Sequence, residues 1–267
     1  MELALKEDAP AGDITSESIF GKDETCQARL VSRENGILCG SDVFSVLQEL
    51  CDHQFSMVLL VAEGDSFLPG DVVAEISGNL QTILKIERPL LNFLQYLSGI
   101  ATQTMQIVKK YPELKILDTR KTIPGYRNFV KYAVYTGGGW NHRLNLSDMA
   151  MLKDNHIQKT GSIGQAVATI RKKNTVKIEV EIDHLGQLQE AINAKPEIIL
   201  LDNFSLQDIK KAVAIIREQK PEIMIEVSGG MTPEKLGELN GFSGIGVSMG
   251  FLTHTTRFLD LSLEFHG

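Results

Sequence analysis

The sequence predicts an α/β protein with a small N-terminal α+β domain and a larger C-terminal domain built on a parallel β-sheet. Two observations predict this organisation. Short β-like segments bounded by glycine occupy residues 26–80, whereas after Tyr111 apolar runs alternate with helical runs. Continuous apolar strands separated by helices are typical of a parallel sheet with both faces covered. The C-terminal domain is therefore a barrel or a doubly wound sheet, and we favour the barrel.

In the N-terminal domain, residues 1–20 predict a short helix followed by a turn at EDAPAGDIT. The β-like segments are CQARLVS, GILCG, SMVLLVAEG and DVVAEISG. The run SDVFSVLQEL between them has helical periodicity and predicts a helix capped by Ser41 or Asp42. A long helix follows, from Leu84 or Glu87 to Lys110. Pro89 is expected in its first turn, where proline is tolerated.

In the C-terminal domain, the predicted strands are LKILDT, AMLKD, VKIEVEI, EIILLD, IMIEVSG and GIGVSMG, and the predicted helices span about 163–173, 185–194, 205–218 and 232–239. Each strand ends in residues capable of chemistry: Arg120 with Lys121, Lys153, Glu181, Asp202, Ser228 and Gly250. Ligands of parallel α/β folds bind at the carboxyl ends of the strands. Functional groups from every strand fit a barrel better than an open sheet, which concentrates its site at one switch point.

The stretch from Asp118 to His156 is a cationic island in an acidic protein. It holds six Lys and Arg residues against three Asp, although the whole chain carries a formal net charge of −7. We expect nearly all these basic residues at strand ends or in turns rather than along a helix face. A local basic cluster suits a small anion, whereas nucleic acid requires a basic face across the domain. The alternative is a solvated charged loop.

The 267 residues, 43% of them hydrophobic, are sufficient for a sizeable core. Cys26, Cys39 and Cys51 are odd in number and lack C-x-x-C spacing, so we expect free or buried thiols in a reducing compartment. Charged residues near the start interrupt any apolar signal sequence, and the uncharged run 89–108 is too polar to span a membrane. A cytoplasmic protein is expected.

Acidic side chains supply a second kind of candidate site. Glu179, Glu181 and Asp183 alternate along one strand, so all three should point the same way. Buried carboxylates are costly unless they meet cations or water. Asp202 could cap the following helix instead, although Asn203 or Ser205 could serve equally well there. Carboxylates at strand ends can hold Mg²⁺ through water or accept hydrogen bonds from sugar hydroxyls.

Two glycine-containing turns, Ser228-Gly229-Gly230 and Gly246–Gly250, follow late strands, where barrels usually bind phosphate. The alternative for either is an ordinary tight turn. Walker A and G-x-G-x-x-G motifs are absent. His142 and Arg143 lie within the cationic island and form a plausible carboxylate clamp. His156 and His254 have no metal-ligand spacing to each other, and we interpret them either as structural residues or as neighbours that support the site residues.

No cysteine lies among these candidates, and no G-x-S-x-G elbow occurs. The candidates are cations, carboxylates and turns suited to phosphate, without an evident nucleophile. This set predicts group transfer from a polyanionic donor to an anionic acceptor, with catalysis by positioning and charge stabilisation.

At this point the residues resemble a known family, the quinolinate phosphoribosyltransferases. The resemblance covers essentially the whole chain through the motifs DTRKTIPGYR, KYAV..GGG.NHR, MLKDNH, EVEI, LLDNF, VSGG and SMGFLTHT, together with the N-terminal ED..AGDIT and the ER..LNFLQ.LSGIAT segment. It implies an N-terminal α/β sandwich domain at residues 1–105 and a C-terminal open, TIM-like α/β barrel at 106–267. The last residues of the chain are a candidate to pack back on the N-terminal domain.

The resemblance also implies a reaction in NAD biosynthesis. Quinolinate and phosphoribosyl pyrophosphate would give nicotinate mononucleotide, pyrophosphate and CO₂, with Mg²⁺ held by Glu181 and Asp202 through water. The residues expected around the quinolinate carboxylates are Arg88, Arg120, His142, Arg143 and Lys153. Lys121 would bind phosphate groups, as could Lys153, and the 5′-phosphate would lie at Ser228, Gly229, Gly230 and Gly250. Lys121, Lys153, Glu181 and Asp202 would be catalytic.

Family members assemble as dimers or larger oligomers, so the resemblance implies that Arg88 reaches the site of a partner subunit. The chain departs from the family pattern at Pro89, Trp140 and Phe251, which affects loop shape rather than charged roles. Three alternatives remain: a relative that acts on nicotinate, a molybdenum-associated relative, and a phosphate-binding regulator without catalysis.

Overall fold

The computed structural model describes residues 1–266 and divides into two compact units. The first comprises Met1–Gln103 and the chain from Thr256 onward, and the second comprises Thr104–Thr255. Helix α4 (Leu80–Lys110) contains the boundary.

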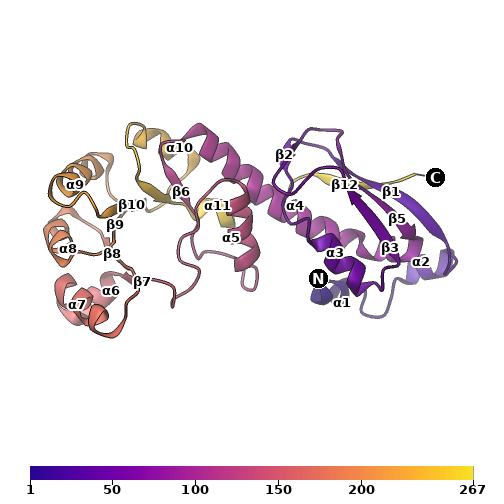
Figure 1. Ribbon diagram of the computed structural model, residues 1–267, viewed down its shortest axis with the longest axis horizontal. Helices are drawn as coiled ribbons and strands as arrows, with labels where there is room; N and C mark the ends of the chain where they lie inside the picture. Colours follow the sequence, from indigo (N-terminus) through magenta and orange to yellow (C-terminus); the bar gives the residue numbers. More distant parts are fainter. Residues whose placement is uncertain (267) are drawn as a thin grey trace. The chain divides into compact units, whose positions relative to one another are not determined.

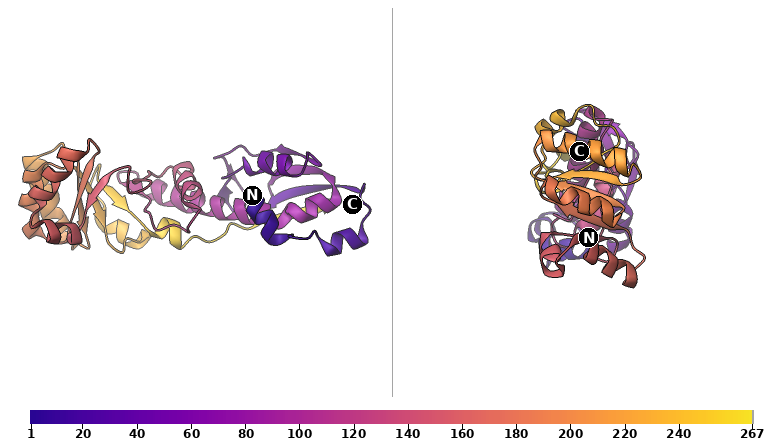
Figure 2. Two further views of the ribbon diagram at one scale, coloured as in Figure 1. Left: turned by 90° about the horizontal axis from the view of Figure 1, so that it is seen from below. Right: turned by 90° about the vertical axis from the view of Figure 1, so that its left-hand side faces the viewer.

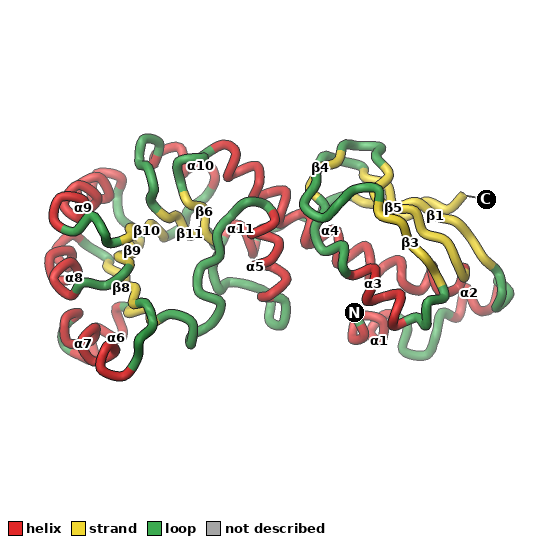
Figure 3. Tube along the Cα trace, in the orientation of Figure 1, coloured by secondary structure: helices red, strands yellow, loops and turns green. Residues whose placement is uncertain are grey.

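The first unit is an antiparallel sheet with helices packed against it (Figure 1). The sheet has the order β12-β1-β5-β3, and β2 and β4 form a separate pair. Figure 3 shows its long strands beside one another. The strands are β1 (Thr25–Ser32), β2 (Gly36–Ile37), β3 (Phe55–Leu59), β4 (Ser66–Phe67), β5 (Val72–Asn79) and β12 (Leu261–His266), and the helices besides α4 are α1 (Glu2–Asp8), α2 (Ile14–Ile19) and α3 (Val43–Leu50).

The core of this unit lies between α4, α3 and the sheet. Ile83, Leu90 and Leu94 of α4 and Leu47 of α3 are fully buried in one apolar cluster with side chains of β1 and β5. The cluster continues to Leu261, because the C-terminal strand β12 pairs with β1 in antiparallel register. Burial of these side chains, at about 1.5–3 kcal/mol each, holds the unit together.

The predicted start of the long helix is wrong. Helix α4 begins at Leu80, because the Oδ1 of Asn79 accepts a hydrogen bond from the Thr82 N–H at 3.0 Å and caps the first turn. Pro89 therefore lies inside the helix rather than in its first turn. A proline there lacks the N–H that would bond to the carbonyl of Lys85. Burial of the apolar face of α4 offsets that loss.

The second unit is an open barrel of parallel strands. Its six-stranded sheet has the order β6-β11-β10-β9-β8-β7, so the first strand of this unit pairs with its last, and β6 and β7 remain as the two edges. The strands are β6 (Lys115–Leu117), β7 (Ala150–Leu152), β8 (Ile178–Ile182), β9 (Ile198–Asp202), β10 (Met224–Ser228) and β11 (Gly246–Ser248). This architecture and the antiparallel N-terminal sheet confirm the predicted fold class.

Helices cover the outside of this sheet, and Figures 1 and 2 show α7, α8 and α9 on the outer side of the strands. Apolar side chains dominate the strands, and Val180, Ile199 and Leu201 are fully buried. The helices are α5 (Arg127–Thr136), α6 (Asp154–Thr160), α7 (Ile163–Lys173), α8 (Leu188–Ala194), α9 (Leu206–Gln219), α10 (Pro233–Leu236) and α11 (Phe251–His254), with 3-10 turns at Leu185–Gln187 and Gly237–Leu239.

Helices α5, α6 and α11 were not predicted. Arg127 and Lys131, which the sequence placed in turns, lie on α5. The helix was missed because RNFVKYAVYT is short and lies between basic residues and glycines. Its apolar side is nevertheless regular, since Val130, Ala133 and Val134 are fully buried.

No helix within residues 1–266 has both the length and the apolar character needed to cross a membrane. All three cysteines are free, with Cys39 and Cys51 buried and Cys26 partly buried.

Two glycines in helices provide a matched test of the packing in each unit. A Cβ at Gly99 of α4 would lie 2.2 Å from the carbonyl oxygen of Arg257, whereas a Cβ at Gly164 of α7 meets nothing within 4 Å. We expect Gly99→Ala to destabilise the protein by about 1–3 kcal/mol. Gly164→Ala should be neutral or stabilise it by up to about 1 kcal/mol. Thermal unfolding of both variants checks this, and equal shifts in Tm would contradict it.

Candidate active site

The carboxyl ends of the barrel strands surround one cavity of about 770 Å³. This cavity brings together eleven of the twelve predicted site residues: Arg120, Lys121, His142, Arg143, Lys153, Glu181, Asp202, Ser228, Gly229, Gly230 and Gly250. The twelfth, Arg88, is exposed on α4 in the first unit and does not line the cavity. The convergence follows from the topology, because all six strands run parallel and end at one rim.

The anionic side of the cavity consists of carboxylates held by neighbouring polar groups. Asp202, at the end of β9, accepts hydrogen bonds from the Ser228 hydroxyl and, at 2.8 Å, from the side-chain amide of Asn203. Lys153 forms an ion pair with Glu181. The cap of α9 is Ser205, whose hydroxyl accepts the Asp208 N–H at 3.1 Å. Asp202 is therefore not used as a helix cap and faces the cavity.

Glu179 and Glu181 of β8, together with Asp183 directly after the strand, divide between two clusters. Glu181, Asp183 and Asp202 have carboxylate oxygens within 4.8 Å of one another at the rim. Glu179 lies deeper and is fully buried, near His142 and Glu226. The alternation predicted that these three side chains point the same way. In the structure they lie at different depths of the barrel, with Glu179 the deepest. Only the rim cluster has oxygen donors open to a cation of the kind Mg²⁺ prefers.

The cationic side is formed by Arg120, Lys121 and Arg143. The Arg143 guanidinium donates to the carbonyl of Met149 at 3.1 Å. Burial, and then the charge of Arg120, lower the pKa of Arg143 from its ordinary value. Two neighbouring guanidinium groups repel each other in a partly dry cavity, so an anion with more than one negative charge would relieve that repulsion.

The glycine turn after β10 depends on backbone conformations that favour glycine. Gly229 has a φ of 97° and Gly230 a φ of 55°. A Cβ at Gly229 would also lie 2.2 Å from the Oδ1 of Asn203. Asn203 itself has a φ of 55°. Asn203 was not among the predicted site residues. The sequence could have indicated it, because an asparagine directly after a strand is one of the few residues that adopt a positive φ readily.

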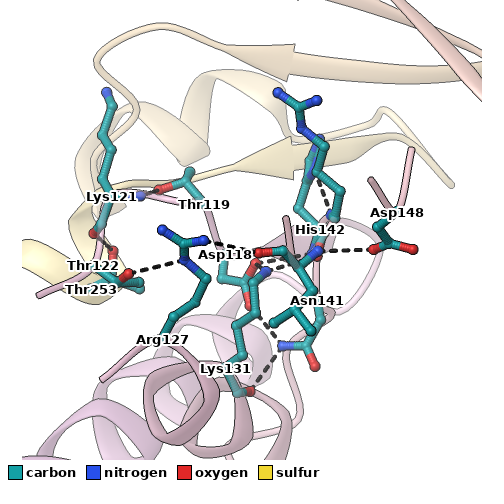
Figure 4. Close-up of polar contacts among 12 residues, drawn as sticks. Asp118, Thr119, Lys121, Thr122, Arg127, Lys131, Asn141, His142, Asp148 and Thr253 are labelled. Carbon is teal, nitrogen blue, oxygen red and sulfur yellow. Dashed lines mark hydrogen bonds and ion pairs between the residues drawn. The ribbon is translucent and has the colours of Figure 1, made fainter. Parts of the chain in front are cut away.

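Beneath the cavity, an internal ion pair supports the loop that carries His142 and Arg143 (Figure 4). Asp118 is fully buried and pairs with Lys131, and its carboxylate also accepts from the Asn141 amide at 2.6 Å and the His142 N–H at 3.0 Å. Lys131 donates further to the His142 carbonyl at 2.7 Å. Lys131 therefore does not belong to the solvent-facing cationic island, contrary to the sequence interpretation. It neutralises a buried carboxylate.

Figure 4 also shows how Lys121 is anchored. Its N–H donates to the Thr119 hydroxyl at 3.1 Å, and its carbonyl accepts from the Thr253 hydroxyl at 2.7 Å. These contacts tie the end of β6 to α11. His254, predicted to be structural or to support the site residues, lines the cavity. His156 does not line it, and the Nδ1 of His156 accepts the Lys153 N–H at 3.1 Å at the start of α6.

His142 is more buried than a simple carboxylate clamp requires. Its Nε2 lies 3.0 Å from Glu179 and 3.4 Å from Glu226, and its Nδ1 accepts the Arg143 N–H at 2.7 Å. Burial lowers the pKa of His142, but the two carboxylates outweigh burial and raise it to about 10. Burial also raises the pKa of Glu179. Both nitrogens of the ring thus face protein groups.

An open α/β barrel whose strand ends gather cations, carboxylates and glycine turns around one cavity defines a class of enzyme that acts on phosphorylated, anionic substrates. Comparison with known proteins specifies the family. Residues 13–98 match the model of the quinolinate phosphoribosyl transferase N-terminal domain, and residues 100–264 match that of the C-terminal domain. The chain belongs to the quinolinate phosphoribosyltransferase family.

Individual relatives agree over nearly the whole length. A Bacillus subtilis protein described as a probable nicotinate-nucleotide pyrophosphorylase (carboxylating) is 40% identical, over 97% of this chain and 89% of its own length. The solved structure of NadC from Streptococcus pyogenes is 38% identical with a TM-score of 0.93, covering 100% of this chain and 95% of its own. The nicotinate-nucleotide pyrophosphorylase structure from Francisella tularensis is 37% identical with a TM-score of 0.94, covering 99% and 94%.

The internal ion pair is the part of this site most sensitive to substitution. Lys131→Met leaves Asp118 buried without its cation, and we expect a loss of about 3–5 kcal/mol of stability at neutral pH. Lys210→Met, on the exposed side of α9, is the matched control and should change stability little.

The pH dependence of this variant has a definite sign. Burial already raises the pKa of Asp118, and removing Lys131 raises it further. The folded variant then binds a proton more readily than the unfolded chain does. Its deficit relative to the wild type should therefore shrink as the pH falls from 7 towards about 4. A deficit that grows over this range in thermal unfolding would contradict the assignment.

Proposed function

We propose that this protein transfers the phosphoribosyl group of phosphoribosyl pyrophosphate to quinolinate with loss of CO₂, giving nicotinate mononucleotide and pyrophosphate. Membership of the family and the relatives' descriptions support the reaction type. The observation that carries the proposal is that Arg120, Arg143 and Lys153 share one cavity with Glu181 and Asp202. Such a cavity suits an anionic acceptor beside a donor that develops positive charge.

On the acceptor side, quinolinate carries two carboxylates, and one arginine could not hold both in a single orientation. Arg120 and Arg143 each offer a planar fork for a carboxylate, and Lys153 adds a mobile point charge. Lys153 is paired with Glu181 in this structure, so the acid competes with Glu181 for it. The pyridine nitrogen is itself the nucleophile, which explains why the site needs no serine or cysteine.

On the donor side, attack at C1′ of the ribose develops positive charge on the sugar. Glu181 and Asp202 supply fixed negative charge there, and Asp202 is held in place by Ser228 and Asn203. Lys121 and the turn Ser228–Gly230 would bind phosphate groups, because the glycines let backbone N–H groups approach an anion. Decarboxylation follows, since the quaternised ring nitrogen stabilises the carbanion left by CO₂, and this carbon then takes up a proton from water to give nicotinate mononucleotide.

The rim cluster of Glu181, Asp183 and Asp202 fits Mg²⁺ by its donor chemistry, which is three carboxylates with oxygens within 4.8 Å. Bound Mg²⁺ supplies positive charge to the leaving pyrophosphate. Glu181 and Asp202 are the residues we propose to hold it, through water where their own partners occupy them.

We further propose that the protein works in the cytoplasm as a homodimer or larger oligomer with a shared active site. In the second unit, Tyr135 and Leu146 are each 69% exposed and Trp140 is 57% exposed. Exposed large apolar side chains of this kind are typical of protein interfaces. Arg88 carries an exposed cation in the first unit, and we propose that it completes the acid site of a partner subunit.

The test of the function is release of CO₂ from carboxyl-labelled quinolinate. We expect release that depends on phosphoribosyl pyrophosphate. Turnover of nicotinate without any of quinolinate would replace the proposal with the paralogue alternative. Binding of phosphoribosyl pyrophosphate without turnover of either acid would favour a regulator.

The shared site predicts rescue between two inactive variants. Arg88→Ala and Lys153→Ala subunits would each be inactive alone, but a mixed dimer should contain one site with both residues intact. Activity in mixtures should therefore approach about a quarter of the wild-type level, since half of randomly mixed dimers are hybrids with one good site of two. Assaying CO₂ release after co-refolding checks this. No rescue would place Arg88 in the site of its own subunit.

A further inference from the structure

Two buried glutamates of the barrel take no part in the proposed chemistry. Glu179 on β8 is fully buried and Glu226 on β10 is 3% exposed. Side chains from alternate strands share a layer inside a barrel, so residues on β8 and β10 can meet across β9. Both oxygens of Glu179 and one oxygen of Glu226 have no hydrogen bond of regular geometry within residues 1–266. Buried carboxylates left in this state destabilise the fold unless another group compensates them.

Both glutamates approach the imidazole of His142. Its Nε2 lies 3.0 Å from Glu179 and 3.4 Å from Glu226, and the histidine side chain is 7% exposed. The other ring nitrogen, Nδ1, accepts the Arg143 N–H at 2.7 Å. A nitrogen that accepts a hydrogen bond carries no proton, so in the neutral form of the ring the contact selects the tautomer with hydrogen on Nε2. That hydrogen faces the two glutamates.

The backbone of His142 is held as firmly as its ring. Its N–H donates to Asp118 at 3.0 Å, and its carbonyl accepts from Lys131 at 2.7 Å. The charged groups around this residue are thus Glu179, Glu226, Asp118, Lys131 and the neighbouring Arg143. Every polar atom of His142 has a protein group beside it, so the ring has no nitrogen left to donate to a substrate.

His142 also has a defined place between two cavities of the barrel. Together with Arg143 and Glu226 it lines both the site cavity and a second cavity of about 490 Å³. The second cavity is lined by residues that begin strands, such as Ile198 and Met224. His142 therefore lies in the wall that separates the acid site from the other end of the barrel.

We propose that Glu179 and Glu226 are positioning residues, which hold the His142 imidazole in the orientation that presents Nδ1 to the Arg143 N–H and thereby fix Arg143 in the wall of the acid site. This inference rests on the proposed function, because Arg143 is there a ligand of the quinolinate carboxylates. It gives His142 a bracing role in place of the direct donor role that the sequence suggested.

The orientation can be tested without substrate. In the intact protein labelled with ¹⁵N-histidine, above the His142 pKa of about 10, where the ring is neutral, we expect His142 to show a protonated Nε2 and an unprotonated Nδ1. The His142→Gln variant identifies its signals among the six histidines. A proton on Nδ1, or a mixture of tautomers, would overturn the proposed orientation.

The positioning role is tested by two substitutions at each glutamate. Glu179→Gln and Glu226→Gln keep an oxygen that can accept the Nε2 proton, whereas Glu179→Leu and Glu226→Leu remove the acceptor at similar volume. We expect the leucine variants to raise the KM for quinolinate by about tenfold to 100-fold, as when other outer partners of functional side chains are removed. The KM for phosphoribosyl pyrophosphate should stay within about twofold. The glutamine variants should stay within about threefold of the wild type for both substrates.

Glu218→Leu, on the exposed surface of α9, is the matched control and should alter neither KM. Equal rises of both KM values in the leucine variants, or no rise in either, would refute the positioning role. Glutamine variants as defective as the leucine variants would show that negative charge, not orientation, is what the glutamates supply, and would refute it too.

Should the leucine variants fail to fold, the histidine spectra of the wild-type and glutamine proteins decide. A wild-type protein that does not use quinolinate would refute the proposed function, while those spectra still settle the orientation of His142.

Discussion

The pairing of β11 with β6 is the constraint on which the second unit depends. Ser248, at the end of the last strand, lies in parallel register with Leu117, at the end of the first. This pairing brings the last strand of the unit beside its first. The sheet stays open at one place, between the edge strands β6 and β7. Groups 132 positions apart, the Thr253 hydroxyl and the Lys121 carbonyl, then bond directly. Because every strand runs the same way, every strand end contributes to one cavity, and chemistry by positioning becomes possible.

The charges around that cavity are held apart by the protein before any ligand binds. Asp202 is fixed by Ser228 and Asn203, and Arg143 is fixed through the Met149 carbonyl and the ring of His142. Such preorganised dipoles and charges do not need to reorient during a reaction. The burial of Asp118, Glu179 and Glu226 is costly, and Lys131 and His142 offset it. Stability and charge placement therefore depend on the same loop.

Much of the fold could be predicted because periodicity reports on burial. Helices α7, α8 and α9 and all six barrel strands lie where alternating apolar and amphipathic runs placed them. The prediction failed where a local pattern was ambiguous. Asn79 ends β5 and also caps α4, so the helix begins at Leu80. The prediction had placed its start at Leu84 or Glu87, because a proline such as Pro89 is usually found in the first turn of a helix. The short helix α5 was taken for a charged turn, because its basic residues do not reveal which of them is buried.

The fold class and eleven residues that line one cavity could be predicted from the residue order alone. Strand ends and glycine turns are visible as local patterns, and parallel strands place their ends at one rim. Only the tertiary structure decided what each charge faces. Lys131 proved internal, His142 lies against two glutamates, and Arg88 belongs to the other unit. The effect of a charged side chain depends on how deeply it is buried and on partners that are distant in sequence. Neither can be read from the order of residue types along the chain.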